Sequence, residues 1–142
     1  MKIATVFAGL GILGALVSAP LWAAADHEVP MAPGAYLEMK NPFKATPEVL
    51  EAGEKLYGKK CGRNCHGLTG NADGTAVKDL EIKPKPFTDK AYMCPKSDGQ
   101  LFWIIENGSP NTDMDNYGEG SDTNLSKDDI WKLVVYIKHF AK

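Results

Sequence analysis

The clearest pattern of apolar and polar positions lies near the end of the chain. Apolar side chains occupy positions i, i+3, i+4 and i+7, the spacing that lines one face of an α-helix, at Ile130, Leu133, Val134 and Ile137. Ser126 and Asp129 precede this stripe at the three-residue spacing of a helix-capping pair. The pattern predicts a C-terminal helix that opens at Ser126 and packs one apolar face against a core.

Two more helices are predicted earlier in the chain. Thr46 is a good N-cap residue followed by a proline, and apolar residues at helical spacing extend the first helix over 47–60. Ser97 opens the second helix, with Gln100 at capping-box spacing behind it, and Asn107-Gly108 ends it. We expect Ser97 and Gln100 together to satisfy the open end of that helix.

Long irregular segments separate the predicted helices. Residues 62–96 are rich in glycine and proline, with room for one short helix near 75–80, and residues 109–124 are rich in turn-forming residues. So long a loop is uncommon in a compact domain unless it has a function, and wrapping a prosthetic group would explain it. No strand pattern of comparable quality appears. The predicted fold class is all-α, with three main helices plus loops and no internal repeat.

The first 25 residues have the organisation of a secretory signal peptide. Lys2 is the only charge before Asp26, and an apolar run is followed by an A-x-A site that ends at Ala25. An uncleaved anchor is the alternative, because residues 3–25 carry no charge and are long enough to span a bilayer. Pro20 and the A-x-A site favour cleavage.

Cleavage after Ala25 divides the chain into three parts. They are a signal peptide over 1–25, an extended lead-in over 26–46, and a single domain over 47–142. With 16 basic and 18 acidic residues the whole chain has a net charge of −2, and loss of Lys2 with the first 25 residues makes it −3. This balance argues against nucleic acid, whose binding needs clustered Lys and Arg. No membrane span is expected after cleavage.

The residues that carry chemistry lie just past the first predicted helix. Cys61 to His66 reads C-G-R-N-C-H, and the chain has three cysteines, an odd number that a purely disulfide-based framework does not explain. Two cysteines followed directly by a histidine can hold haem, because each thiol can add to a haem vinyl group and the histidine then lies under the iron. Three residues separate the cysteines here, where two are usual. A disulfide-stapled binding module is the non-haem alternative.

Beyond this motif, nearly all of the chain after the signal resembles the class I cytochrome c family. Residues 52–57 resemble the family's N-terminal helix, and residues 66–74 resemble its glycine-rich turn. Residues 98–108 are similar to its internal helix, 109–114 to the loop that delivers the distal methionine, and 130–137 to its C-terminal helix. The order and spacing of these segments are more specific than the haem motif alone.

The resemblance implies a site with one covalently bound haem c. Cys61 and Cys65 would attach the haem, with His66 as the proximal and Met114 as the distal iron ligand. A backbone carbonyl near Pro84 or Pro86 would accept a hydrogen bond from His66 Nδ1.

Two features leave the distal position open. Asp115 follows Met114 where the family usually has proline. Cys94 is the alternative distal ligand, as a thiolate, or a link to a second chain.

The resemblance also implies a function. We expect an exported, periplasmic carrier of single electrons between redox proteins that dock at the haem edge, and not an enzyme. The chain is expected to act alone, as a dimer or as a subunit of a larger redox complex. The alternatives are a low-potential haem protein with Cys94 on the iron, or a ligand-binding haem protein with an open distal position.

Overall fold

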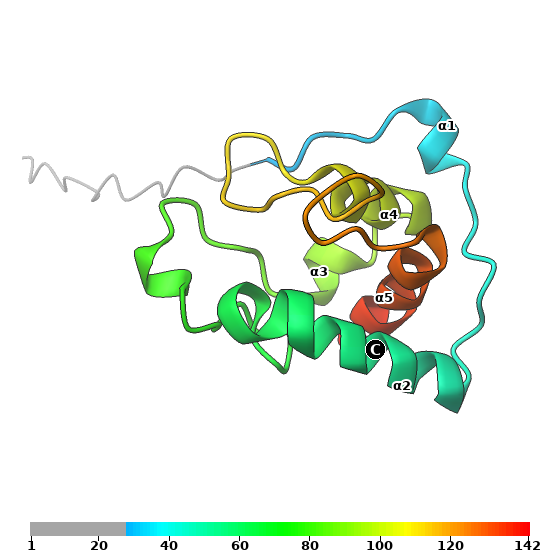
Figure 1. Ribbon diagram of the computed structural model, residues 1–142, viewed down its shortest axis with the longest axis horizontal. Coiled ribbons are helices and arrows are strands. Elements are labelled where there is room, and N and C mark those ends of the chain that lie inside the picture. Colours follow the sequence, from blue (N-terminus) through cyan, green and yellow to red (C-terminus); the bar gives the residue numbers. More distant parts are fainter. Residues whose placement is uncertain (1–27) are drawn as a thin grey trace, which may run out of the picture.

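The computed structural model describes residues 28–142, so the predicted signal peptide over 1–25 lies outside the described residues. Within 28–142 every regular element is a helix, which confirms the all-α prediction (Figure 1). In chain order they are α1 (Gly34–Leu37), α2 (Pro47–Tyr57), the π-helix η1 (Gly58–His66), the 3₁₀-helix η2 (Val77–Asp79), α3 (Lys90–Met93), α4 (Asp98–Asn107) and α5 (Lys127–His139). None of the helices between residues 28 and 142 is long and apolar enough to cross a membrane.

The core lies between α2, α4 and α5. The apolar stripe of the C-terminal helix is buried, with Ile130, Leu133 and Val134 wholly inaccessible to solvent. The Phe102 ring of α4 packs on the Trp131 ring of α5, with their centroids 4.2 Å apart. The predicted face of α5 is therefore the face that holds the domain together, through apolar area removed from water.

All three predicted N-caps are formed. The Thr46, Ser97 and Ser126 side chains accept hydrogen bonds from the amides of Val49, Gln100 and Asp129, at 3.4, 3.1 and 3.2 Å. The capping box expected at Ser97 is only half formed, however. The Gln100 side chain does not return to the helix end but reaches the lead-in, where its amide bonds the backbone of Pro30 and Ala32.

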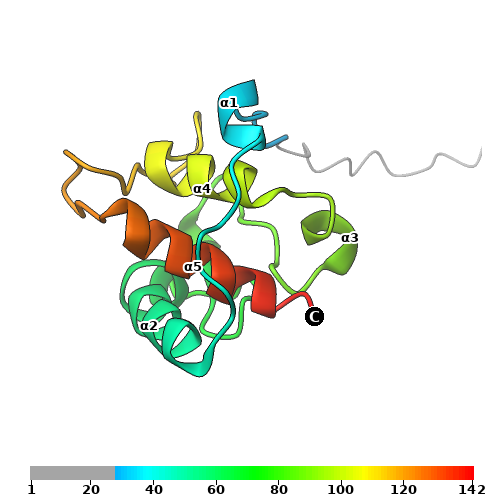
Figure 2. The same cartoon turned by 90° about the vertical axis from the view of Figure 1, so that its right-hand side faces the viewer.

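Three local predictions need correction. The lead-in is not extended throughout, because α1 interrupts it (Figure 2). The first predicted helix does not end near residue 60: α2 ends at Tyr57 and the chain continues as η1 to His66. The short helix α3 was not predicted. Asp89 caps it by accepting a hydrogen bond from the Tyr92 amide at 3.2 Å, a local contact within a segment without clear periodicity.

Gly53 permits the close crossing of α2 and α5. A Cβ at this position would lie 2.7 Å from the Lys132 carbonyl oxygen and 2.7 Å from the Tyr136 Cβ. A backbone carbonyl and a Cβ atom of a packed helix cannot move away by a change of side-chain rotamer.

We expect Gly53→Ala to lower the free energy of unfolding by about 1–3 kcal/mol, because the added methyl group forces α2 away from α5. Gly58→Ala is the matched control, since nothing lies within 4 Å of a Cβ there and the backbone is helical. Alanine at position 58 is expected to stabilise by about 0.5–1 kcal/mol through helix propensity. Denaturant titration of both variants measures the difference, and equal effects would contradict the crossing account.

Candidate functional site

The helix η1 presents both cysteines and the histidine of the motif. Gly58–His66 winds as a π-helix, whose hydrogen bonds run from i to i+5, so that one turn holds more residues than the 3.6 of an α-helix. The extra residue between Cys61 and Cys65 is thus taken up inside the helix. His66 remains directly after Cys65, at the last position of η1.

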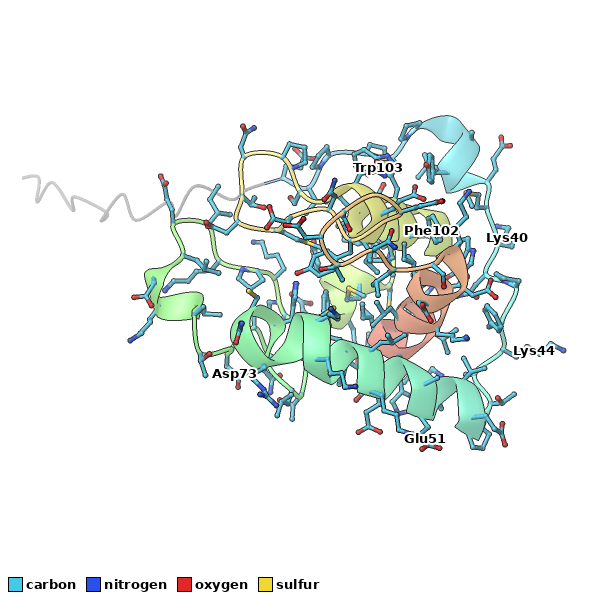
Figure 3. The ribbon with its side chains drawn as sticks, in the orientation of Figure 1. Lys40, Lys44, Glu51, Asp73, Phe102 and Trp103 are labelled. Atoms are coloured by element: carbon cyan, nitrogen blue, oxygen red, sulfur yellow. The ribbon has the colours of Figure 1, made fainter. Side chains whose placement is uncertain are left out.

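The loop that follows fixes the end of η1. Carbonyl groups at the end of a helix have no partner within it and need one from outside. Here the carbonyls of residues 63–66 accept the amides of Thr75, Ala76, Gly74 and Ala72, at 3.1, 2.9, 3.4 and 2.8 Å respectively. Figure 3 labels Asp73 in this loop, beside the end of η1. The backbone that carries Cys65 and His66 is therefore held by hydrogen bonds from loop 72–76.

A cavity of about 780 Å³ opens beside η1. Cys61, Cys65 and His66 line it from one side, and Met114 lines it from the loop after α4. Apolar side chains of α4, among them Leu101 and Ile105, complete much of the wall.

The structure thus brings four of the five predicted site residues to one place. The fifth, Cys94, is exposed and does not line the cavity.

His66 lies in the cavity wall as a neutral ring. Burial lowers the pKa of His66 to about 4, so the imidazole is unprotonated at neutral pH and can bind a metal. Its Nδ1 atom is buried and has no hydrogen-bond partner, so the prediction that a carbonyl near Pro84 or Pro86 accepts from it is wrong. The Phe87 ring lies against the imidazole instead, 4.5 Å away and within 14° of parallel.

The cysteines of the motif are neutral thiols. All three cysteines of the chain are unpaired, so the disulfide-stapled alternative does not fit this structure. Burial raises the pKa of the Cys61 thiol to about 12 and also raises the pKa of Cys65. A thiol with a raised pKa is a poor nucleophile and a poor zinc ligand. Between residues 28 and 142, no group of three or more His, Cys, Asp or Glu could hold a metal ion.

The loop that carries Met114 is tied to itself and to η1. The Met114 amide donates to the Thr112 hydroxyl at 3.2 Å, and its carbonyl accepts the Ser109 amide at 2.9 Å. The Tyr117 hydroxyl donates to the Lys60 carbonyl at 3.3 Å and so joins this loop to η1. Burial raises the pKa of Tyr117 to about 12, which keeps this donor protonated.

Sequence reasoning missed two residues of the site, Phe87 and Tyr117. Phe87 stacks on His66 from a loop that has no periodic pattern, so no signal in the sequence marked it. Tyr117 follows Met114 by three residues, and its link to Lys60 spans 57 positions, a distance over which spacing rules carry no information.

Comparison with known proteins shows the family to which the chain belongs. Residues 48–137 match the sequence model of the family described as cytochrome c oxidase, cbb3-type, subunit III, which covers more than half of the chain. The chain belongs to this family. It is a class I c-type cytochrome, and the cofactor of such proteins is covalently bound haem c. The resemblance in the sequence is therefore confirmed at the level of family, fold class and cofactor.

Several solved structures are similar to the chain. One is part of the reducing HAO-like protein complex of Kuenenia stuttgartiensis, with 26% identity and a TM-score of 0.62 over 75% of this chain. This chain covers 49% of that one, about half of its length. Another is the c-type cytochrome KustC0563, with 24% identity and a TM-score of 0.50, over 63% of this chain and 98% of that one. No curated protein sequence matches this chain.

The residues present fit a haem c. Its flat, mostly apolar body needs a cavity with apolar walls, and the two thiols that would carry it stand on one helix at the rim of such a cavity. His66 and Met114 bring a neutral imidazole and a thioether to this cavity, and both groups serve as iron ligands in c-type cytochromes.

Proposed function

We propose that this cytochrome is an exported carrier of single electrons between redox proteins. One haem c would be attached through Cys61 and Cys65, and His66 and Met114 would hold its iron. The observation that supports this most is the single cavity on which these four side chains converge. The proposal includes the division of the chain into a signal peptide over 1–25, a lead-in over 26–46 and a cytochrome domain over 47–142.

The bound haem supplies reversible one-electron chemistry between Fe(III) and Fe(II). The protein supplies binding, orientation and surroundings. His66 stands on the backbone held by loop 72–76, with Phe87 against its ring, so its position is fixed before any ligand binds. Met114 stands on a loop braced by its own hydrogen bonds. If His66 and Met114 both hold the haem, the protein would leave no open position for a substrate, which favours a carrier over an enzyme.

The geometry favours Met114 over Cys94 as the distal ligand. Met114 lines the cavity, whereas Cys94 is exposed at the end of α3 and would have to turn inward as a thiolate. Burying an anionic sulfur costs far more free energy than burying a neutral thioether. Met93, the residue before Cys94, also lines the cavity and is 2% exposed, so it is the second thioether that an experiment has to consider.

Charged side chains surround the proposed haem edge and offer a docking surface for a partner. Asp113 and Asp115, on either side of Met114, are exposed. The pKa of the Cys65 thiol is raised mainly by burial and further by the nearby charge of Asp113. On the other side, Lys59, Lys60 and Arg63 line a shallow polar hollow on η1. The similarity to a chain of an HAO-like complex supports a redox protein as partner, or membership of a larger redox complex.

If charge steers the partner, reversal of Asp113 and Asp115 is expected to change the bimolecular electron-transfer rate by about tenfold at low salt. The reason is that these carboxylates border the site where the two proteins meet. Reversal of Glu38 and Asp128, two exposed carboxylates that do not line the cavity, is the matched control with the same change in net charge.

Stopped-flow measurement against a charged redox protein over a range of ionic strengths gives the comparison. A carrier should show a rate that depends steeply on salt, and only the first pair should change that dependence. Equal effects of the two pairs would mean that the rate depends on the net charge of the protein and not on carboxylates at the docking surface. A failure of the haem to exchange electrons with any protein partner would contradict the carrier function.

A further inference from the structure

The lead-in is fastened to the domain ahead of the region that matches the family, which begins at residue 48. The Tyr36 hydroxyl donates to Glu106 Oε2 at 2.6 Å, and the Tyr36 carbonyl lies where a Cβ on Gly99 would otherwise be. Farther along, Asn41 Nδ2 donates to the Trp131 carbonyl at 2.8 Å. Figure 2 shows the lead-in passing over α4 and α5, and these hydrogen bonds join it to both helices.

Gln100 makes the contact at the start of the described lead-in. Its Oε1 atom accepts the Ala32 amide at 2.8 Å, and its Nε2 atom donates to the Pro30 carbonyl at 3.1 Å. Gln100 is 5% exposed and Ala32 is 4% exposed, so water does not replace these bonds. A buried amide with both ends bonded to one segment holds that segment in a single position, because moving it would leave polar groups unsatisfied.

The same residue lines the cavity of the proposed haem. Gln100 and Val29 are both part of the wall of the 780 Å³ cavity, although they lie more than 70 positions apart in the chain. The beginning of the lead-in is therefore a piece of the cavity wall, and Gln100 is the side chain that joins this piece to α4.

We propose that Gln100 is a positioning residue that fastens residues 29–32 over the cavity and so keeps water away from the haem. This inference rests on the proposed function, because a haem must occupy the cavity. Water beside a haem stabilises the more highly charged ferric state. A wall that excludes water therefore raises the midpoint potential, and a loosened wall lowers it.

Gln100→Leu tests the proposal, since leucine has a similar size but can form neither hydrogen bond. Two readouts apply to the haem-loaded protein. Hydrogen exchange of the peptide that contains Ala32 is expected to become about tenfold faster, because its buried amide loses its acceptor. The midpoint potential is expected to fall. If Gln100 instead acted through its own polarity, replacing it by an apolar side chain would raise the midpoint potential. The direction of the change in potential therefore distinguishes an effect through the lead-in from a direct effect of the side chain.

A double-mutant cycle with Val29→Gly tests whether Gln100 affects the midpoint potential through the lead-in. If Gln100 acts through the lead-in, Val29→Gly lowers the potential in the wild type and has no further effect in Gln100→Leu, where the segment has already lifted. Additive effects, or an unchanged or raised potential in Gln100→Leu, would overturn the proposal.

Asn41→Ala is the matched control, because it loosens the far end of the lead-in at a residue that does not line the cavity. It is expected to speed local exchange without moving the potential, and a potential that falls as far as in Gln100→Leu would also overturn the proposal. Absence of haem from the wild type would instead refute the proposed function, so the two failures are distinguishable.

Discussion

A chain in which Cys61 and Cys65 are both replaced by serine is expected to lose all covalently held haem and to fail to fold stably. The cavity measures about 780 Å³ and has largely apolar walls. Without haem, the apolar walls of this cavity are left in contact with water, and apolar surface exposed to water costs about 25 cal/mol per Å². This loss is large beside the roughly 5–15 kcal/mol by which a domain is usually stable.

Haem staining after denaturing electrophoresis and thermal unfolding followed by circular dichroism measure the two effects. The single variants Cys61→Ser and Cys65→Ser are each expected to keep one bond to the haem and an intermediate stability. Cys94→Ser is the control, because that thiol is exposed and away from the cavity, and it should retain the haem and the fold. Covalent haem in the double variant, or its loss in Cys94→Ser, would contradict the attachment site.

Met114→Ala is expected to lower the midpoint potential by more than about 59 mV, which is one decade in a one-electron equilibrium. A soft thioether favours Fe(II), and its removal leaves a position that water can occupy, which favours Fe(III). The long-wavelength sulfur-to-iron absorption band of the ferric protein should disappear. The reduced variant should also bind carbon monoxide, which the closed wild-type site should not.

Two controls separate Met114 from the other sulfur atoms nearby. Met93→Leu removes the second thioether of the cavity wall at nearly constant volume, and Cys94→Ala removes the exposed thiol. Neither is expected to change the sulfur-to-iron band. Loss of the band in Met93→Leu would identify Met93 of α3, and not Met114, as the iron ligand. A sharp rise in potential in Cys94→Ala would assign a thiolate ligand and make this a low-potential protein.

The parts of the fold that the sequence predicted are those set by short-range spacing. The caps at Thr46, Ser97 and Ser126 act within three residues, and the stripe on α5 repeats every turn, so both are visible in the sequence.

The parts that could not be predicted depend on partners far away in the chain. Gln100 stands at capping-box spacing, yet its partners Pro30 and Ala32 lie about 70 positions earlier and satisfy its amide better than the helix end does. The π-helical winding of η1 ends against the amides of loop 72–76, which no helical periodicity reveals. Exposure of Cys94 likewise follows from tertiary packing alone.

The most direct test of the account is the mass of the intact protein, expressed in a host that attaches haem c and then denatured in acidified organic solvent. Attachment through Cys61 and Cys65 predicts a single species with the mass of the chain from Asp26 onward plus one haem, and no haem in the solvent. A polypeptide of unmodified mass, with its haem extracted or with none at all, would contradict the assignment of this site.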